Sequence, residues 1–137
     1  MKKAIMLLVC LFMFIGCMDK EVDISKKQVR NGVVYVVGDS KPFTGKLIGK
    51  YDNGQKKVSE EYKEGIQEGA VTRYYKNGNT IYTGVYVDGK KDGEWNYYSS
   101  ENKLAAKLIY QNGKLIGEEQ YLVDVDGLKN KVKNLFD

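Results

Sequence analysis

The chain contains no histidine, so the commonest general base and metal ligand of enzymes is missing from all 137 residues. Without a histidine, Ser99 and Ser100 cannot form a serine–histidine nucleophilic pair. No Gly-Lys-Ser or Gly-Lys-Thr triplet occurs, which excludes the usual phosphate-binding loop. The sequence therefore predicts a protein that is not an enzyme.

Grouped acidic residues are also scarce. Glu60-Glu61 and Glu118-Glu119 are adjacent pairs on predicted strands, so the two side chains of each pair point to opposite faces and cannot share a substrate. Asp124 and Asp126 offer too few oxygen atoms for a calcium loop. We expect no metal site, no cofactor and no small-molecule substrate.

Cysteine occurs twice, as Cys10 and Cys17. Lys2 and Lys3 precede the apolar stretch Ala4–Ile15, which is too short to span a bilayer and is typical of an export signal. Cys10 lies inside this stretch and would be removed with it, which leaves Cys17 without a disulfide partner.

The segment Phe14–Cys17 resembles the lipobox of bacterial lipoproteins, in which the cysteine becomes the lipidated first residue of the mature chain. It departs from the usual pattern at Phe14, where leucine is expected, and the alternative is an ordinary secretory signal with an incidental cysteine. A lipid on Cys17 would anchor the chain without a transmembrane helix. We therefore predict a membrane-anchored lipoprotein of the bacterial cell envelope that faces the periplasm or the cell exterior.

Charge of one sign does not dominate the chain. The formal net charge is +4, and removal of Lys2 and Lys3 lowers it to +2, which is too weak to indicate a nucleic-acid partner. Residues 18–28 are polar and charged without a sustained period, so we predict a flexible tether there. The β-rich run Val33–Val37 and then Pro42, the single proline, follow the tether.

From Gly45 onward the sequence has a 24-residue period, and a period in this range indicates a stacked array of identical supersecondary units. Three sets of residues carry the period: Gly45, Gly69, Gly93 and Gly117; Gly65, Gly89 and Gly113; and Tyr62, Tyr86 and Tyr110.

Dipeptide turn signals separate the predicted strands. They are Asn53-Gly54, Glu64-Gly65, Asn77-Gly78, Asp88-Gly89 and Asn112-Gly113. Such pairs suit type I′ hairpins, in which both residues need a positive φ. A shorter and a longer interval alternate between successive turn glycines, so each repeat has two strands and two turns. In the third repeat Asn102 takes the place of the glycine and can hold the same left-handed position.

The predicted fold is all-β, with antiparallel hairpin repeats that form an elongated, twisted meander sheet. The strands are expected at Lys46–Asp52, Lys56–Tyr62, Ala70–Tyr75, Thr80–Val87, Glu94–Ser99, Lys103–Tyr110 and Glu118–Val123. The repeat domain covers 29–124, after a signal peptide at 1–17. A short helical cap over 125–137 should follow, with Asp126 as its N-cap.

Alternation of side chains gives this sheet one tyrosine-rich face and one mixed face, and the mixed face includes Lys46, Glu94 and Glu118. The tyrosine-rich face is the candidate surface for a peptide, a glycan or lipid headgroups, and the alternative is that its rings pack the repeat. The candidate residues are Tyr51, Tyr75, Tyr82, Tyr86, Trp95, Tyr97 and Tyr110.

The segments Gly45–Gly54, Gly69–Gly78, Tyr86–Trp95 and Tyr110–Gly113 resemble MORN-type repeats, in the variant found in bacterial proteins of the YwqK type. The resemblance covers 29–123. Proteins of that type are often labelled antitoxin components, so the resemblance implies a protein-binding module whose partner is a toxin or another envelope protein. An export signal fits an immunity protein against an envelope-acting toxin. The alternative is a structural or adhesive envelope lipoprotein without a dedicated toxin partner.

Overall fold

The computed structural model describes residues 20–121. The predicted signal peptide, Cys17 and the predicted C-terminal helix lie outside the described residues. The described part contains ten strands and one short 3₁₀ turn. Eight strands form one sheet in the order β1-β4-β5-β6-β7-β8-β9-β10, and β2 and β3 form a separate hairpin. Between residues 20 and 121 there is no helix with the length and hydropathy needed to cross a membrane.

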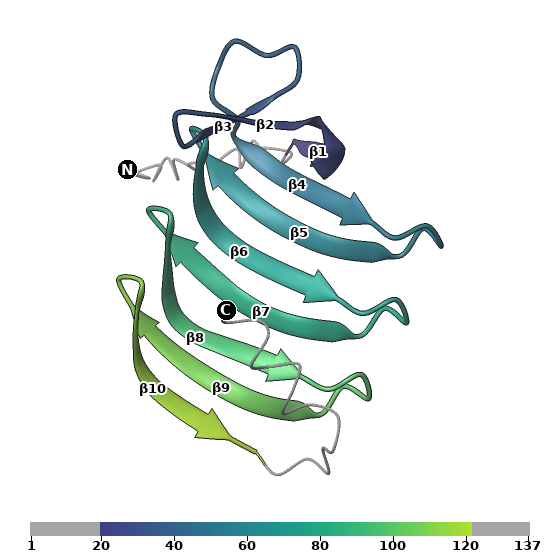
Figure 1. The fold of residues 1–137 in the computed structure, drawn as a ribbon, viewed down its shortest axis with the longest axis vertical. Helices are drawn as coiled ribbons and strands as arrows, with labels where there is room; N and C mark the ends of the chain where they lie inside the picture. The colour runs from purple at the N-terminus through teal and green to yellow at the C-terminus, as the bar shows by residue number, and fades with distance from the viewer. Residues whose placement is uncertain (1–19, 122–137) are drawn as a thin grey trace, which may run out of the picture.

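The repeat region is the antiparallel meander that the period predicted, and its curved strands succeed one another along the long axis of the molecule (Figure 1). Its strands are β4 (Gly45–Lys50), β5 (Lys56–Lys63), β6 (Ile66–Tyr74), β7 (Thr80–Val87), β8 (Lys90–Tyr98), β9 (Leu104–Gln111) and β10 (Lys114–Gln120). Three of them, β6, β8 and β10, begin four residues earlier than predicted. Each follows a two-residue turn, so the chain returns to the sheet at once.

The predicted flexible tether is wrong for the described part of 18–28. Residues 21–28 form β1 (Glu21–Asp23), the 3₁₀ turn η1 (Ile24–Lys26) and the start of β2 (Lys27–Arg30). Strand β1 pairs in parallel with β4, and Val22 and Ile24 pack against the core. These two apolar side chains fix a segment whose other residues are mostly polar.

The turns are of two kinds, which corrects the prediction of type I′ hairpins throughout. Glu64-Gly65, Asp88-Gly89 and Asn112-Gly113 have positive φ at both residues, as type I′ turns require. At the turns that end in Gly54, Gly78 and Asn102, only these last residues have positive φ.

The second kind of turn is a three-residue loop that closes with a bulge. In the first one the Tyr51 N–H donates to the Gln55 carbonyl at 2.9 Å, and the Gly54 N–H donates to the Tyr51 carbonyl at 2.9 Å. Loops of this kind therefore alternate along the sheet with the shorter type I′ loops. This alternation contributes to the unequal intervals between turn glycines in the sequence.

The apolar residues gather in two clusters. The first joins Val34 and Val36 of β3 (Val33–Val36) to Phe43, Leu47 and Tyr62, so the β2–β3 hairpin covers one end of the sheet. The buried residues of the second are Val71, Trp95, Tyr97, Ala106 and Leu108, with Tyr82, Tyr86 and Tyr110 packed against them. Among the described residues, this second cluster is built from β6–β9 alone.

The face assignment fails in the last strand, where Glu118 and Gln120 were expected on the mixed face. In β10 the register shifts by a one-residue bulge between Leu115 and Gly117, which brings Glu118 directly opposite Leu108. Because directly paired residues point to the same side of a sheet, Glu118 lies on the tyrosine-rich face and not on the mixed face. The line of buried residues on this face therefore ends at the charged Glu118 in β10.

Candidate functional site

Five aromatic residues on β7, β8 and β9 form what we call the aromatic cluster: Tyr82, Tyr86, Trp95, Tyr97 and Tyr110. Trp95 is its centre, with ring centroids 5.7 Å from Tyr82, 5.2 Å from Tyr86 and 6.0 Å from Tyr110. The Tyr86 and Tyr110 rings meet the indole edge to face, an arrangement that aromatic pairs favour. Tyr97 joins the cluster through Tyr82, at 5.5 Å.

Trp95 is 1% exposed although the described strands form a single layer at this point. The reason is Gly84 on the neighbouring strand, because a Cβ atom at Gly84 would lie 2.3 Å from the indole ring. The missing side chain lets the indole sink onto the sheet, and the surrounding tyrosines then cover it. Trp95 and Tyr97 are thus core residues, whereas Tyr82, Tyr86 and Tyr110 are half-buried and form the rim of the cluster.

Lys91 lies across the cluster. Its ammonium group is 4.3 Å from the centroid of the Trp95 ring and 4.9 Å from that of Tyr110, both within cation–π range. Burial lowers the pKa of Lys91 and raises the pKa of Tyr86 and of Tyr110. The rim therefore presents protonated phenols, which donate hydrogen bonds, beside a partly desolvated cation.

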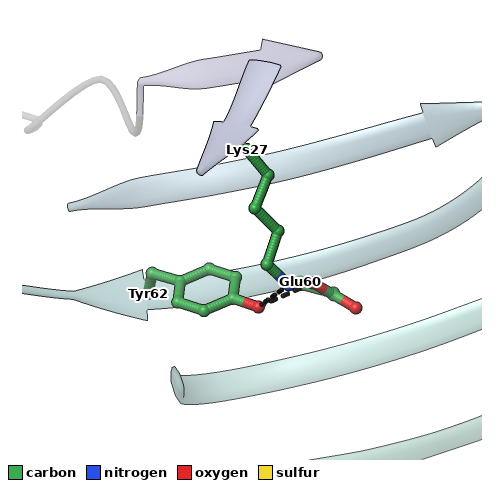
Figure 2. Close-up of polar contacts among 3 residues, drawn as sticks. All are labelled: Lys27, Glu60 and Tyr62. Atoms are coloured by element: carbon green, nitrogen blue, oxygen red, sulfur yellow. Dashed lines mark hydrogen bonds and ion pairs between the residues drawn. The ribbon is translucent and has the colours of Figure 1, made fainter. Parts of the chain in front are cut away.

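A second polar group lies beside the first apolar cluster (Figure 2). The Lys27 ammonium donates to the Glu60 carboxylate at 3.2 Å and to the Tyr62 hydroxyl at 2.7 Å, and that hydroxyl donates to the same carboxylate oxygen at 2.7 Å. Burial, followed by the hydrogen bond to Glu60, raises the pKa of Tyr62. Because Lys27 belongs to β2 and the other two residues to β5, this group fastens the capping hairpin to the sheet.

Tyr51 and Tyr75 were predicted to lie on the binding face, but they have a different role. The Tyr51 hydroxyl donates to the Tyr74 carbonyl at 2.7 Å, and the Tyr75 hydroxyl donates to the Tyr98 carbonyl at 3.0 Å. Each bond crosses from one three-residue turn to the strand end of the next repeat. These hydroxyls are therefore used in joining repeats, and neither residue is part of the aromatic cluster.

Asparagine side-chain amides in these three-residue turns also join neighbouring repeats. The Asn53 amide donates to the Lys76 carbonyl, and the Asn77 amide donates to the Ser100 carbonyl. The next turn has Glu101 at this position, so the series ends there.

Polar side chains also link the repeats at the opposite ends of the strands, where the type I′ turns lie. Thr44, Glu68 and Asp92 follow the 24-residue period and accept hydrogen bonds from the backbone N–H groups of Glu64, Asp88 and Asn112 in the type I′ turns. These contacts give the carboxylates of Glu68 and Asp92 a structural role. Across residues 20–121 no three acidic or cysteine side chains come together as a metal site.

The sequence did not indicate Lys91, Lys27 or Glu60 as site residues. The sequence did contain a signal for Glu60. This residue lies one period before Gly84 and two periods before Leu108, so it is the charged member of a repeat position that is otherwise apolar. Lys91 had no such signal, because its column holds the unlike residues Phe43 and Gln67.

A hollow of about 350 Å³ lies near the capped end, lined by Lys20 and residues 39–44. Its one carboxylate, Asp39, is already paired with Lys20 at 3.3 Å. We therefore take the aromatic cluster, and not this hollow, as the candidate site. Comparison with protein-family models, curated proteins and solved structures finds no match to this chain.

Proposed function

We propose that this chain is a membrane-anchored, non-enzymatic binding module that presents the rim of the aromatic cluster to a protein partner. The observation that supports this proposal is that the two apolar clusters are covered differently. The capping hairpin covers the first, whereas the second is formed by β6–β9 alone among the described strands and leaves Tyr82, Tyr86 and Tyr110 half-exposed. Tyrosines anchored in this way offer a large, rigid contact area, as in protein interfaces.

Lipidation at Cys17 would hold this surface near a membrane. Strand β1 begins at Glu21, only four residues after Cys17, so the connection spans at most about 14 Å. The end of the sheet that carries β1 and β4 would then lie near the bilayer, and the rim on β7–β9 would lie further along the sheet, where it can meet an envelope protein. An immunity-like role against an envelope-acting toxin fits this placement and the resemblance to antitoxin proteins.

The first experiment is capture of partners from envelope extract by the full chain in detergent. Wild type is compared with a Tyr82→Ala/Tyr86→Ala variant and with a Tyr74→Ala/Tyr98→Ala control, whose substitutions lie outside the aromatic cluster. We expect a defined partner that the control retains and the cluster variant loses, with circular dichroism confirming that all three fold. Absence of any partner would instead favour a structural or adhesive lipoprotein, and equal retention of a partner by both variants would contradict the rim as its binding site.

The anchor and the immunity-like role need separate tests. Cells fed a labelled fatty acid should label the wild-type chain and leave Cys17→Ser unlabelled, and an unlabelled wild-type chain would contradict lipidation. Deletion of the gene should make cells sensitive to their own toxin. Normal growth of the deletion strain beside toxin-producing siblings would contradict the immunity-like role while leaving the binding role open to the capture experiment.

A further inference from the structure

The second apolar cluster has no covering layer among the described residues. The β2–β3 hairpin covers the first cluster, whereas β6–β9 alone form the second. The apolar surface continues to the end of the sheet, because Leu115 of β10 pairs with Tyr110 and is 45% exposed. Apolar sheet faces are normally packed against a second layer of structure, and this face offers such a layer a continuous surface.

Tyr121 leads the chain away from the sheet beside this surface. Its backbone N–H donates to the Ala105 carbonyl at 2.9 Å, so the chain is still attached to β9 at this point. Strand β8, which carries Trp95, lies two strand spacings from β10, about 10 Å. Residues 122–126 span about 17 Å when extended, so the part of the chain that follows them can reach the aromatic cluster.

The sequence that follows has the pattern of an amphipathic helix. Its apolar residues share one side of a helix, and they are Leu128, Val132, Leu135 and Phe136. Asn130 lies on the opposite side. Lys129 and Lys131 lie at the two sides of the apolar stripe, where their long side chains can reach solvent or the exposed Glu118 carboxylate of β10.

The mixed face of the sheet suits this apolar stripe less well. A polar row crosses it, in which Thr83 pairs directly with Thr72 on β6 and with Asn96 on β7's other neighbour, β8. The ion pair between Lys107 and Glu94, at 3.6 Å, lies on the same face. An apolar stripe therefore gains more contact area on the tyrosine-rich face.

We propose that residues 127–136 form an amphipathic helix that docks on the rim of the aromatic cluster and covers it until the protein partner displaces it. The helix thus covers the second cluster as the β2–β3 hairpin covers the first. The displacement rests on the proposed function, whereas the docking does not. Because the partner competes with a segment of the same chain, its apparent affinity falls with the fraction of chains whose rim is uncovered.

Cross-linking tests the docking in the full chain in neutral detergent. Val132→Cys is combined with Tyr86→Cys on the rim, or with Val85→Cys, which points to the mixed face because neighbouring strand residues alternate. A bismaleimide should cross-link the pair that contains Tyr86→Cys and not the pair that contains Val85→Cys. Val132→Cys alone controls for reaction with the native cysteines. Equal cross-linking of the two pairs, or none at Tyr86→Cys, would overturn the proposal.

Trp95 fluorescence gives a second test that leaves the sheet unchanged, since Trp95 is the single tryptophan of the chain. Val132→Asp places a charge in the apolar stripe, so it should increase acrylamide quenching of Trp95 and shift its emission to longer wavelength. Asn130→Asp, on the opposite side of the helix, is the matched control and should change neither. Identical quenching and emission in Val132→Asp and wild type would overturn the docking, including where Tyr86→Cys does not fold.

Capture from envelope extract separates failure of this inference from failure of the proposed function. Val132→Asp should capture more partner than wild type, and Asn130→Asp the same amount. If Val132→Asp captures no more than wild type while Tyr82→Ala/Tyr86→Ala captures none, the helix does not compete and the inference fails, but the binding module stands. If no chain captures a partner and only the Tyr86→Cys pair cross-links, the docked helix stands and the binding module fails.

Discussion

The indole ring of Trp95 occupies the space that a side chain at Gly84 would need, with ring atoms 2.3 Å from the position of a Cβ there. The two residues lie on neighbouring strands of the sheet. Gly84 therefore decides how deep the aromatic cluster sits, although it has no side chain and no place in the 24-residue glycine columns.

Gly84→Ala should destabilise the fold by about 2 kcal/mol, because the new methyl group must displace a large buried ring. Urea unfolding followed by Trp95 fluorescence measures this loss, and the native emission should shift to longer wavelength as the ring is pushed toward water. Gly117→Ala is the matched control, since its Cβ would meet the Ile109 side chain at 3.3 Å or more, against 2.3 Å from the indole ring at Gly84. Equal costs for both variants would refute the packing argument.

Lys27→Met should lower the free energy of unfolding by about 2 kcal/mol, because the part-buried Glu60 carboxylate then loses its cation. Lys20→Met is the control. It breaks the ion pair with Asp39, in which the Lys20 side chain is 59% exposed and the Asp39 side chain 47% exposed. The unfolding free energy should therefore change by less than about 0.5 kcal/mol. A small effect of Lys27→Met would show that the apolar contacts of the hairpin alone hold it on the sheet.

Tyr75→Phe should lower the free energy of unfolding by about 1 kcal/mol, since it removes the hydroxyl that donates to the Tyr98 carbonyl and leaves the ring in place. Tyr74→Phe provides the comparison, because the Tyr74 hydroxyl has no hydrogen-bond partner in residues 20–121. Chemical denaturation of both variants gives the difference. Identical stabilities would mean that the bond between repeats contributes nothing measurable.

Stability should fall as the pH rises above about 10. Burial raises the pKa of Tyr62, Tyr86 and Tyr97 above the ordinary value of 10.0, so the folded chain keeps protons that the unfolded chain releases. Their contribution is complete below pH 10 and is lost as the pH approaches the raised values. Urea midpoints at about pH 8 and pH 11 test this expectation, and Tyr62→Phe should reduce the difference. A midpoint that is constant across this range would contradict it.

The fold was predictable where two turn signals flank a strand. Strand β7 has the predicted bounds Thr80–Val87, because Asn77-Gly78 precedes it and Asp88-Gly89 follows it. The N-terminal strand β1 could not be predicted in this way. It is very short and pairs in parallel with β4, with Glu21 opposite Lys46, so its partner is distant along the chain and no local pattern marks it.

The candidate site was predictable only in part. The tyrosine column at Tyr62, Tyr86 and Tyr110 indicated the correct face, since the period fixes which residues share it. The same pattern cannot separate buried rings from exposed ones. That separation depends on Gly84, which lies on the strand next to Trp95, and pairing across strands is visible only in the structure.

The hydrogen bonds between successive turns have a consequence for the history of the chain. Most of these turns are satisfied by groups at equivalent positions of the neighbouring repeat, so a block such as 66–89 repeats most of the donors and acceptors that its neighbours require. In-frame duplication of such a block would add two strands and lengthen the sheet by about 10 Å. The length of this sheet is thus a quantity that evolution can change one hairpin at a time, with no turn to redesign.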